Sequence, residues 1–199
     1  MGITSIADLN EAFLKNNDLL NIKQVIGLKY YTDLEKRIPR DEMNNWNNFF
    51  QNLLQITLNS MKKIPSKVSL ELVGSYRRQS ESSGDIDVLI SSNSQQKELM
   101  SKLFENLMKT PVTNKELTFS SGTTKYMGIC KIDKYYRHVD IFYYSEKEYP
   151  FALLFSTGSG QFNVEMRADA IKKGYSLSEK TLKYNSNKGD PVNENDYIS

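Results

Sequence analysis

The stretch at residues 72–90, LVGSYRRQSESSGDIDVLI, constrains the fold most, because it joins two apolar runs through a loop rich in glycine, serine and arginine. The run before the loop, residues 67–74, alternates apolar and polar side chains, as a half-buried strand does. The run after it, residues 85–90, is a second expected strand. The sequence therefore predicts a sheet with a polar, basic loop between two of its strands.

Asp85 and Asp87 occupy alternate positions of the second run, so they project from one face, whereas Ile86 and Val88 point into a core. Two carboxylates on one face repel each other unless a cation lies between them. Hard oxygen ligands suit Mg²⁺, with Mn²⁺ as a possible substitute. The pair therefore predicts a divalent metal site of the kind that serves phosphoryl transfer.

Asp140 is the expected third carboxylate, because it is a lone acid within the apolar and aromatic run RHVDIFYY. Two-metal sites need carboxylates shared between ions about 3.5–4 Å apart, which a neighbouring strand can supply. Taken alone, Asp140 also fits an exposed acid at a sheet edge. With Asp85 and Asp87 already assigned, a metal ligand is the preferred interpretation.

The loop between the strands has the residues of a phosphate-binding site. Gly74 allows close approach of the backbone to a ligand, and Ser75 adds a hydroxyl. The arginine pair at 77–78 suits bidentate phosphate contact. Ser83 and the amide of Gly84 complete the loop. A GS pair or a D-x-D pair alone is common, but the two at this spacing between apolar strands is a specific combination.

The rest of the chain predicts an α+β fold, with a mixed β-sheet, flanking helices and a small C-terminal α/β unit. An apolar stripe at helical spacing favours a long core helix from residue 41. We expect a helical segment at 1–61, a catalytic domain at 62–145 and a nucleotide-selecting subdomain at 146–199. Helices are expected over 5–16, 20–37, 41–64, 94–110 and 161–174, and further strands over 124–132 and 137–144.

Composition excludes several kinds of site. Cys130 is the only cysteine and His138 the only histidine, so an internal disulfide and the usual zinc sites are excluded. The absence of a long apolar run and a mean hydropathy of -0.55 argue against a membrane partner. A reducing, intracellular location fits. The net charge of +2 neither requires nor excludes nucleic acid.

These motifs resemble the X family of DNA polymerases, of the beta type. GSYRRQSESSGDIDVLI is similar to the family's palm signature, and RHVDIF to its third-carboxylate strand. IGLKYYTDLEKRIPRDEM resembles the connection from fingers to palm. FSTGSGQFNVEMRADAIKKGYSLSE is similar to the nucleotide-binding region. The resemblance covers nearly the whole chain.

The resemblance implies a role for each matching residue. Asp85 and Asp87 would bind both metals, and Asp140 the catalytic metal beside the primer hydroxyl. Asn163 would touch the incoming base and Arg167 the template strand; without the family, both are solvated helix residues. The other implied nucleotide-binding residues are Arg37, Gly74, Ser75, Arg78, Ser83, Gly84, Phe155 and Gly158.

The chain departs from the family pattern at three places. His138 stands where the family has arginine, either to position the primer hydroxyl or as a neutral replacement. Phe155-Ser156 stands where the family has Tyr-Phe, so sugar discrimination is open. Gly160 replaces an aspartate that commonly follows TGS. The family's lyase domain and glycine-rich hairpins have no counterpart in the sequence, so lyase activity is not expected.

The function that follows is template-directed, gap-filling repair synthesis on gapped or primed DNA with deoxynucleoside triphosphates, performed by a monomer. By resemblance the location is the nucleus, or the cytoplasm or virion for a viral protein. Two alternatives stay open. One is a template-independent nucleotidyltransferase; the other is a vestigial, non-catalytic DNA-binding protein.

Overall fold

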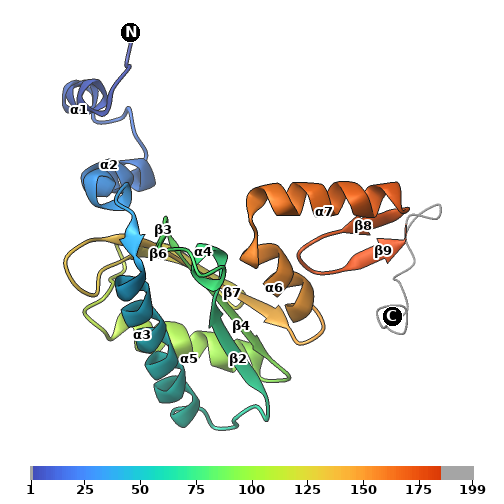
Figure 1. Cartoon of the computed structure of the whole chain (residues 1–199). Helices are drawn as coiled ribbons and strands as arrows, with labels where there is room; N and C mark the ends of the chain where they lie inside the picture. Colours follow the sequence, from blue (N-terminus) through green and yellow to red (C-terminus); the bar gives the residue numbers. More distant parts are fainter. Residues whose placement is uncertain (1, 185–199) are drawn as a thin grey trace.

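The computed structural model describes residues 2–184 and has one mixed five-stranded sheet at its centre (Figure 1). β4 (Ile86–Ser92) and β7 (Arg137–Ser145) pair in parallel, and the other neighbouring strands pair antiparallel. The α+β class predicted from the sequence is confirmed. In spatial order the strands are β2 (Val68–Leu72), β4 (Ile86–Ser92), β7 (Arg137–Ser145), β6 (Lys125–Cys130) and β5 (Thr118–Ser121).

Two long helices, α3 (Arg40–Asn59) and α5 (Gln96–Met108), cover one face of the sheet (Figure 1). The predicted stripe of α3 is confirmed, since Trp46 and Phe50 are among its buried residues. They share one core with Leu103 of α5 and with strand residues such as Val88. Burying each such side chain stabilises the fold by about 1.5–3 kcal/mol.

The opposite face of the sheet carries the C-terminal elements. Ala152 of α6 (Tyr149–Thr157) packs with Leu89 and Val73 in a second, smaller apolar cluster. The sequence pattern did not predict α6. It did predict the next helix, α7 (Gly160–Lys172), whose end is followed by Gly174 at a φ of +83°. A hairpin of β8 (Tyr175–Leu177) and β9 (Leu182–Tyr184) follows.

The N-terminal helices lie beyond one end of the sheet (Figure 1). They are α1 (Ile6–Lys15) and α2 (Ile22–Leu34), and both contain no buried residue. Ser5 caps α1 in a reciprocal capping box with Asp8, as the sequence indicates. The division at residues 62 and 146 stays a prediction, although α3, before residue 62, shares the core of the sheet.

Three short elements around the central loop were not predicted. α4 (Gly74–Arg77) is a single helical turn directly after β2. β1 (Ile38–Pro39) pairs with β3 (Ser82–Ser83), and the Arg40 amide donates to the Glu81 carbonyl at 3.0 Å. The link between α2 and α3 is thereby tied to the central loop. Within residues 2–184, no helix has both the length and the apolar character that a membrane crossing requires.

Candidate active site

Asp87 and Asp140 face each other across the parallel pair of β4 and β7, because the register sets one directly opposite the other. Their strand neighbours, Val88 and Ile141 among them, are fully buried beneath α3 and α5. Period-two alternation therefore sends both carboxylates to the opposite face. β4 begins at Ile86, so Asp85 lies one residue before the strand rather than on it, and it is exposed.

The three carboxylates affect one another electrostatically. Burial, followed by the charges of Asp85 and Asp140, raises the pKa of Asp87 to about 7. Burial also raises the pKa of Asp140; His138 and Lys125 act against this rise, whereas Asp85 adds to it. The register of β4 and β7 holds like charges near each other, at a cost that a bound cation would remove.

Gly74 makes room for the Asp87 carboxylate. Its φ is +61°, and a Cβ atom at this position would lie 3.0 Å from Oδ2 of Asp87. A residue with a side chain would therefore meet both backbone strain and a steric clash here. The sequence indicates a glycine at a strand end, and the structure adds that its free side faces a metal-ligand candidate, Asp87.

The residues present fit a divalent cation by their chemistry. Asp87 and Asp140 on one face, with Asp85 just before the strand, offer only hard oxygen donors, the type that Mg²⁺ and Mn²⁺ bind. As the side chains stand, residues 2–184 contain no group of three or more His, Cys, Asp or Glu side chains close enough to hold an ion. The backbone positions of Asp87 and Asp140 support the assignment, and rotation of the side chains would be needed to bring the carboxylates together.

The loop after β2 brings together four of the predicted phosphate contacts. The hydroxyls of Ser75 and Ser83 lie 2.8 Å apart, and Ser83 is buried. Arg37 donates from Nη2 to the Ser82 carbonyl at 2.6 Å, and its Nη1 lies 3.4 Å from where a Cβ of Gly84 would be. Arg37, the residue directly before β1, thus contacts the loop, and its contact with a triphosphate stays a prediction.

Arg78 joins this loop to the C-terminal unit. Its Nη1 donates to the carbonyl of Thr157 at 2.6 Å and would lie 3.1 Å from a Cβ at Gly158. The neighbouring Arg77 donates to the Thr157 hydroxyl at 3.1 Å and pairs with Glu71 at 3.3 Å. Both arginines therefore contact the end of α6, on the side of the sheet that carries the acids.

Asn163 and Arg167 lie together on α7, against Phe155. Asn163 donates from Nδ2 to the Phe155 carbonyl at 2.8 Å, and the Arg167 guanidinium lies 5.1 Å from the ring centre. Arg167 also pairs with Glu179 at 3.8 Å. Oδ1 of Asn163 and Nε of Arg167 are buried without a hydrogen-bond partner in the described part of the chain. Such orphaned groups favour a polar ligand beside them.

Sequence reasoning missed three residues that position this site. Thr157 and Glu179 hold Arg78 and Arg167, and nothing in their local sequence signals a long-range contact. Arg137 is 2% exposed; it pairs with Glu42 at 2.8 and 2.7 Å and donates to the Lys36 carbonyl at 2.6 Å. Arg137 could have been identified from the sequence, because an arginine at an inward position of a strand requires a buried partner.

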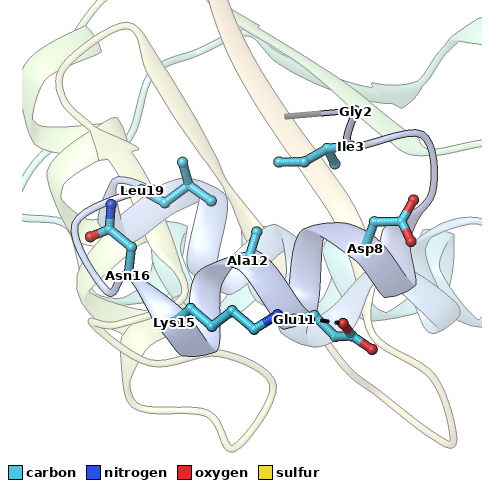
Figure 2. Close-up of a pocket in the computed structure, with 8 residues that line it drawn as sticks. All are labelled: Gly2, Ile3, Asp8, Glu11, Ala12, Lys15, Asn16 and Leu19. Carbon is cyan, nitrogen blue, oxygen red and sulfur yellow. Dashed lines mark ion pairs between the residues drawn. The ribbon is translucent and has the colours of Figure 1, made fainter.

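A pocket beside α1 is separate from these residues. It has a volume of about 510 Å³ and is lined by Ile3, Ala12 and Leu19, with charged side chains at its rim (Figure 2). Lys15 and Glu11 form an ion pair of 3.9 Å along that rim. None of the predicted site residues lines it, so its size does not make it the candidate active site.

Two family models match the chain: DNA polymerase beta palm over residues 37–146, and DNA polymerase beta thumb over residues 152–196. DNA polymerase lambda of Arabidopsis thaliana is 31% identical over 181 residues, which cover 85% of this chain and 33% of that protein. DNA polymerase lambda of Rattus norvegicus is 32% identical over 171 residues, which cover 82% of this chain and 29% of that protein.

The chain spans about a third of the length of these curated relatives. The palm match contains every acid of the candidate metal site and the whole central loop, and the thumb match contains the Asn163 and Arg167 helix. The resemblance drawn from the motifs is confirmed: the chain belongs to the X family of DNA polymerases, with a beta-type palm followed by a beta-type thumb.

Proposed function

We propose that the chain is the catalytic core of a DNA-directed DNA polymerase, which adds deoxynucleotides to a primer 3′-hydroxyl in gapped or primed DNA. The observation that carries the proposal is the parallel register that sets Asp87 opposite Asp140, with Asp85 just before the same strand. The family membership and the similarity to DNA polymerase lambda support it. The parts at 1–61, 62–145 and 146–199 would serve as fingers-like, palm and nucleotide-selecting units.

Asp85, Asp87 and Asp140 would hold Mg²⁺, or Mn²⁺ in its place. When bound, such ions supply Lewis-acid stabilisation of the charge that develops during in-line displacement at the α-phosphate. The buried backs of β4 and β7 fix the two strand carboxylates before substrate arrives. This preorganisation lowers the barrier, because little reorganisation remains at the moment of reaction. The primer oxygen would bond to the α-phosphorus as pyrophosphate leaves.

The triphosphate would lie in the central loop. Arg37, Ser75 and Arg78 offer donors around it, and Gly74, Ser83 and Gly84 shape the backbone. Arg78 holds the Thr157 carbonyl in the free protein. A charged phosphate oxygen is a stronger acceptor than a carbonyl, so nucleotide binding would compete for this arginine. Binding of a nucleotide in the loop would then affect the thumb through Arg78, which contacts both.

The base and the sugar would lie against the thumb. Phe155 and Gly158 would border the sugar, and Oδ1 of Asn163 and Nε of Arg167 would meet the base pair. Both atoms are buried and lack a partner in residues 2–184, which supports a polar ligand at this place. Phe155-Ser156 would lie at the sugar side, so the choice between deoxynucleotides and ribonucleotides is an outcome of the test below.

The test is nucleotide incorporation on a gapped duplex with Mg²⁺, with deoxynucleotides and ribonucleotides in parallel. We expect gap filling that Asp140→Ala abolishes, with the variant still folded by circular dichroism. Wild-type activity in Asp140→Ala would contradict the metal assignment. Equal extension of a single-stranded primer without template would support template-independent transfer instead. DNA binding without incorporation would support a vestigial protein.

We also expect the chain to act as a monomer in the nucleus. Sedimentation would measure the oligomeric state, and imaging of a tagged chain would show the location.

A further inference from the structure

A cluster of basic and aromatic side chains lies where α2 meets the turn between β6 and β7. Its aromatic members are Tyr30, Tyr135 and Tyr136, and its basic members are Lys29, Lys36 and Lys131. The rings of Tyr30 and Tyr136 lie 4.2 Å apart, centre to centre. We call these six residues the basic–aromatic platform. No predicted site residue belongs to it.

Each ring of the platform has an ammonium group over it. Lys36 lies 4.1 Å from the centre of the Tyr135 ring, Lys131 lies 5.0 Å from Tyr136, and Lys29 lies 5.2 Å from Tyr30. Such contacts at exposed sites are weak, and lysine has a long flexible stem. A ligand that offers both anionic groups and flat rings can therefore draw the lysines to its anions and take their place on the tyrosines.

The charge balance of the platform is positive. Lys134 adds a further cation, 5.2 Å from the Tyr135 ring. Asp33 accepts from the Tyr136 amide at 3.2 Å and pairs with Lys36 at 3.7 Å, and Asp133 is exposed on the same turn. Within residues 2–184, Lys29, Lys131 and Lys134 have no carboxylate within ion-pair distance, whereas Lys36 has one. The lysines are thus available for phosphates.

The tyrosines at 135–136 lie directly before β7, the strand that carries Asp140. Tyr136 precedes Asp140 by four residues, and a strand rises about 3.3 Å per residue, so their Cα atoms lie roughly 13 Å apart. This distance corresponds to roughly two to four nucleotides of a strand. Exposed His138 lies between them in the chain. A nucleic-acid strand that ends at Asp140 can therefore reach the tyrosines.

We propose that the basic–aromatic platform binds unpaired bases of a single-stranded 3′ segment, whose phosphates contact its lysines and whose end is presented to Asp140. Unpaired bases are required because a paired and stacked base has no free face for a tyrosine. The placement of the 3′ end rests on the proposed function; the binding of single-stranded nucleic acid does not. The platform would let the chain hold a frayed or unpaired primer end.

The test is binding of a labelled oligothymidylate of roughly twelve nucleotides to the chain of residues 1–199 in the absence of metal. Fluorescence anisotropy measures the affinity. Tyr136→Leu should weaken binding roughly ten-fold or more, because a stacked base is lost. Tyr136→Phe keeps the ring and should bind as the wild type does. The control is Tyr184→Leu, which removes one ring of the pair with Tyr175 in the hairpin of β8 and β9.

The contribution of the lysines is measured separately, by the salt dependence of binding. Lys36→Gln combined with Lys134→Gln should lower the slope of log affinity against log salt by about 1.4, since each single-strand phosphate contact contributes about 0.7. The matched control, Lys102→Gln with Lys109→Gln on α5, should leave the slope unchanged. These two lysines pair with Glu105 at 3.0 and 2.7 Å, away from the platform.

Two results would overturn the proposal: unchanged oligonucleotide binding in folded Tyr136→Leu, or an equal loss of affinity for a blunt duplex of the same sequence. The second result would assign the platform to duplex DNA. Failure of the proposed function is distinguishable, because it would appear as no incorporation by the wild type while tyrosine-dependent binding persists. Asp140→Ala should keep that binding.

Discussion

The palm sheet and the thumb hold their functional residues in different ways. Asp87 and Asp140 lie on strands whose alternate residues are fully buried, so core packing fixes the backbone beneath each acid. Asn163 and Arg167 lie on α7, which contains no buried residue. Polar contacts and one aromatic ring hold them instead. The candidate metal ligands are thus fixed by packing, and the proposed nucleotide contacts by groups that a ligand could replace.

The largest effect should come from the palm acids. Asp140→Ala should lower primer extension with Mg²⁺ by about a thousand-fold or more, because a charge-stabilising group at the reacting centre is lost. The matched control is Asp133→Ala, which removes an exposed acid from the turn before the same strand and should retain activity. Comparable losses in both variants would show that net charge, rather than a metal ligand, matters.

The packing difference predicts unequal costs for similar truncations. Leu103→Ala should lower the free energy of unfolding by about 2–5 kcal/mol, because its side chain is fully buried between α5 and the sheet. Ile171→Ala on α7 should change it by less than about 0.5 kcal/mol, because Ile171 is 65% exposed. Urea unfolding of the metal-free proteins measures both values. A similar loss in the two variants would remove the contrast between palm and thumb.

The crowded carboxylates predict a stability that falls as pH rises. The pKa of Asp87 is about 7 in the folded protein and about 3.9 in unfolded chains, so ionisation between these values costs folded-state stability. The metal-free wild type should therefore lose stability from pH 4 to pH 8. At pH 8, Asp87→Asn should be more stable by roughly 1–4 kcal/mol.

Urea unfolding in the presence of a chelator, at several pH values, measures this difference. Added Mg²⁺ should raise the stability of the wild type at pH 8 and leave Asp87→Asn nearly unchanged. Parallel pH profiles for wild type and variant would mean that the burial of Asp87 has no energetic consequence.

The smallest effect should come from the link between loop and thumb. Arg78→Lys should raise the KM for nucleotide about five- to ten-fold, because lysine cannot reproduce a bidentate phosphate contact. Arg77→Lys is the matched neighbour; it contacts Glu71 and the Thr157 hydroxyl, and its KM should change less than about two-fold. Steady-state kinetics on gapped DNA would separate them, and equal changes would refute a special role for Arg78.

Long periodic segments were predictable from the sequence. The stripe of Met43, Trp46 and Phe50 repeats often enough to define the helix α3 and its buried face. The lone acid in RHVDIFYY indicated a strand beside the Asp87 strand, and the observed register agrees. The first prediction rests on a repeated apolar pattern and the second on a lone acid within an apolar run, and both signals are local. The roles of the individual site residues stay predictions until the variants above are measured.

Short or long-range features could not be predicted in this way. The pairing of Ile38 and Pro39 with Ser82 and Ser83 involves two residues on each side, too few for any period. The contact of Arg78 with the Thr157 carbonyl joins positions far apart in the chain, and an exposed arginine carries no sign of its partner. Such contacts depend on how the folded helices and strands pack against one another. A local sequence pattern does not contain that information.

The parallel register of β4 and β7 also bears on which insertions and deletions this chain can accept. A one-residue insertion between Asp140 and Tyr143 would shift part of the strand relative to its partners and reverse its faces, and an acid forced into the core would unfold it. An insertion at exposed Gly122, between β5 and β6, would only lengthen a surface turn. Length variation in natural or engineered versions should therefore concentrate in that turn and avoid β7.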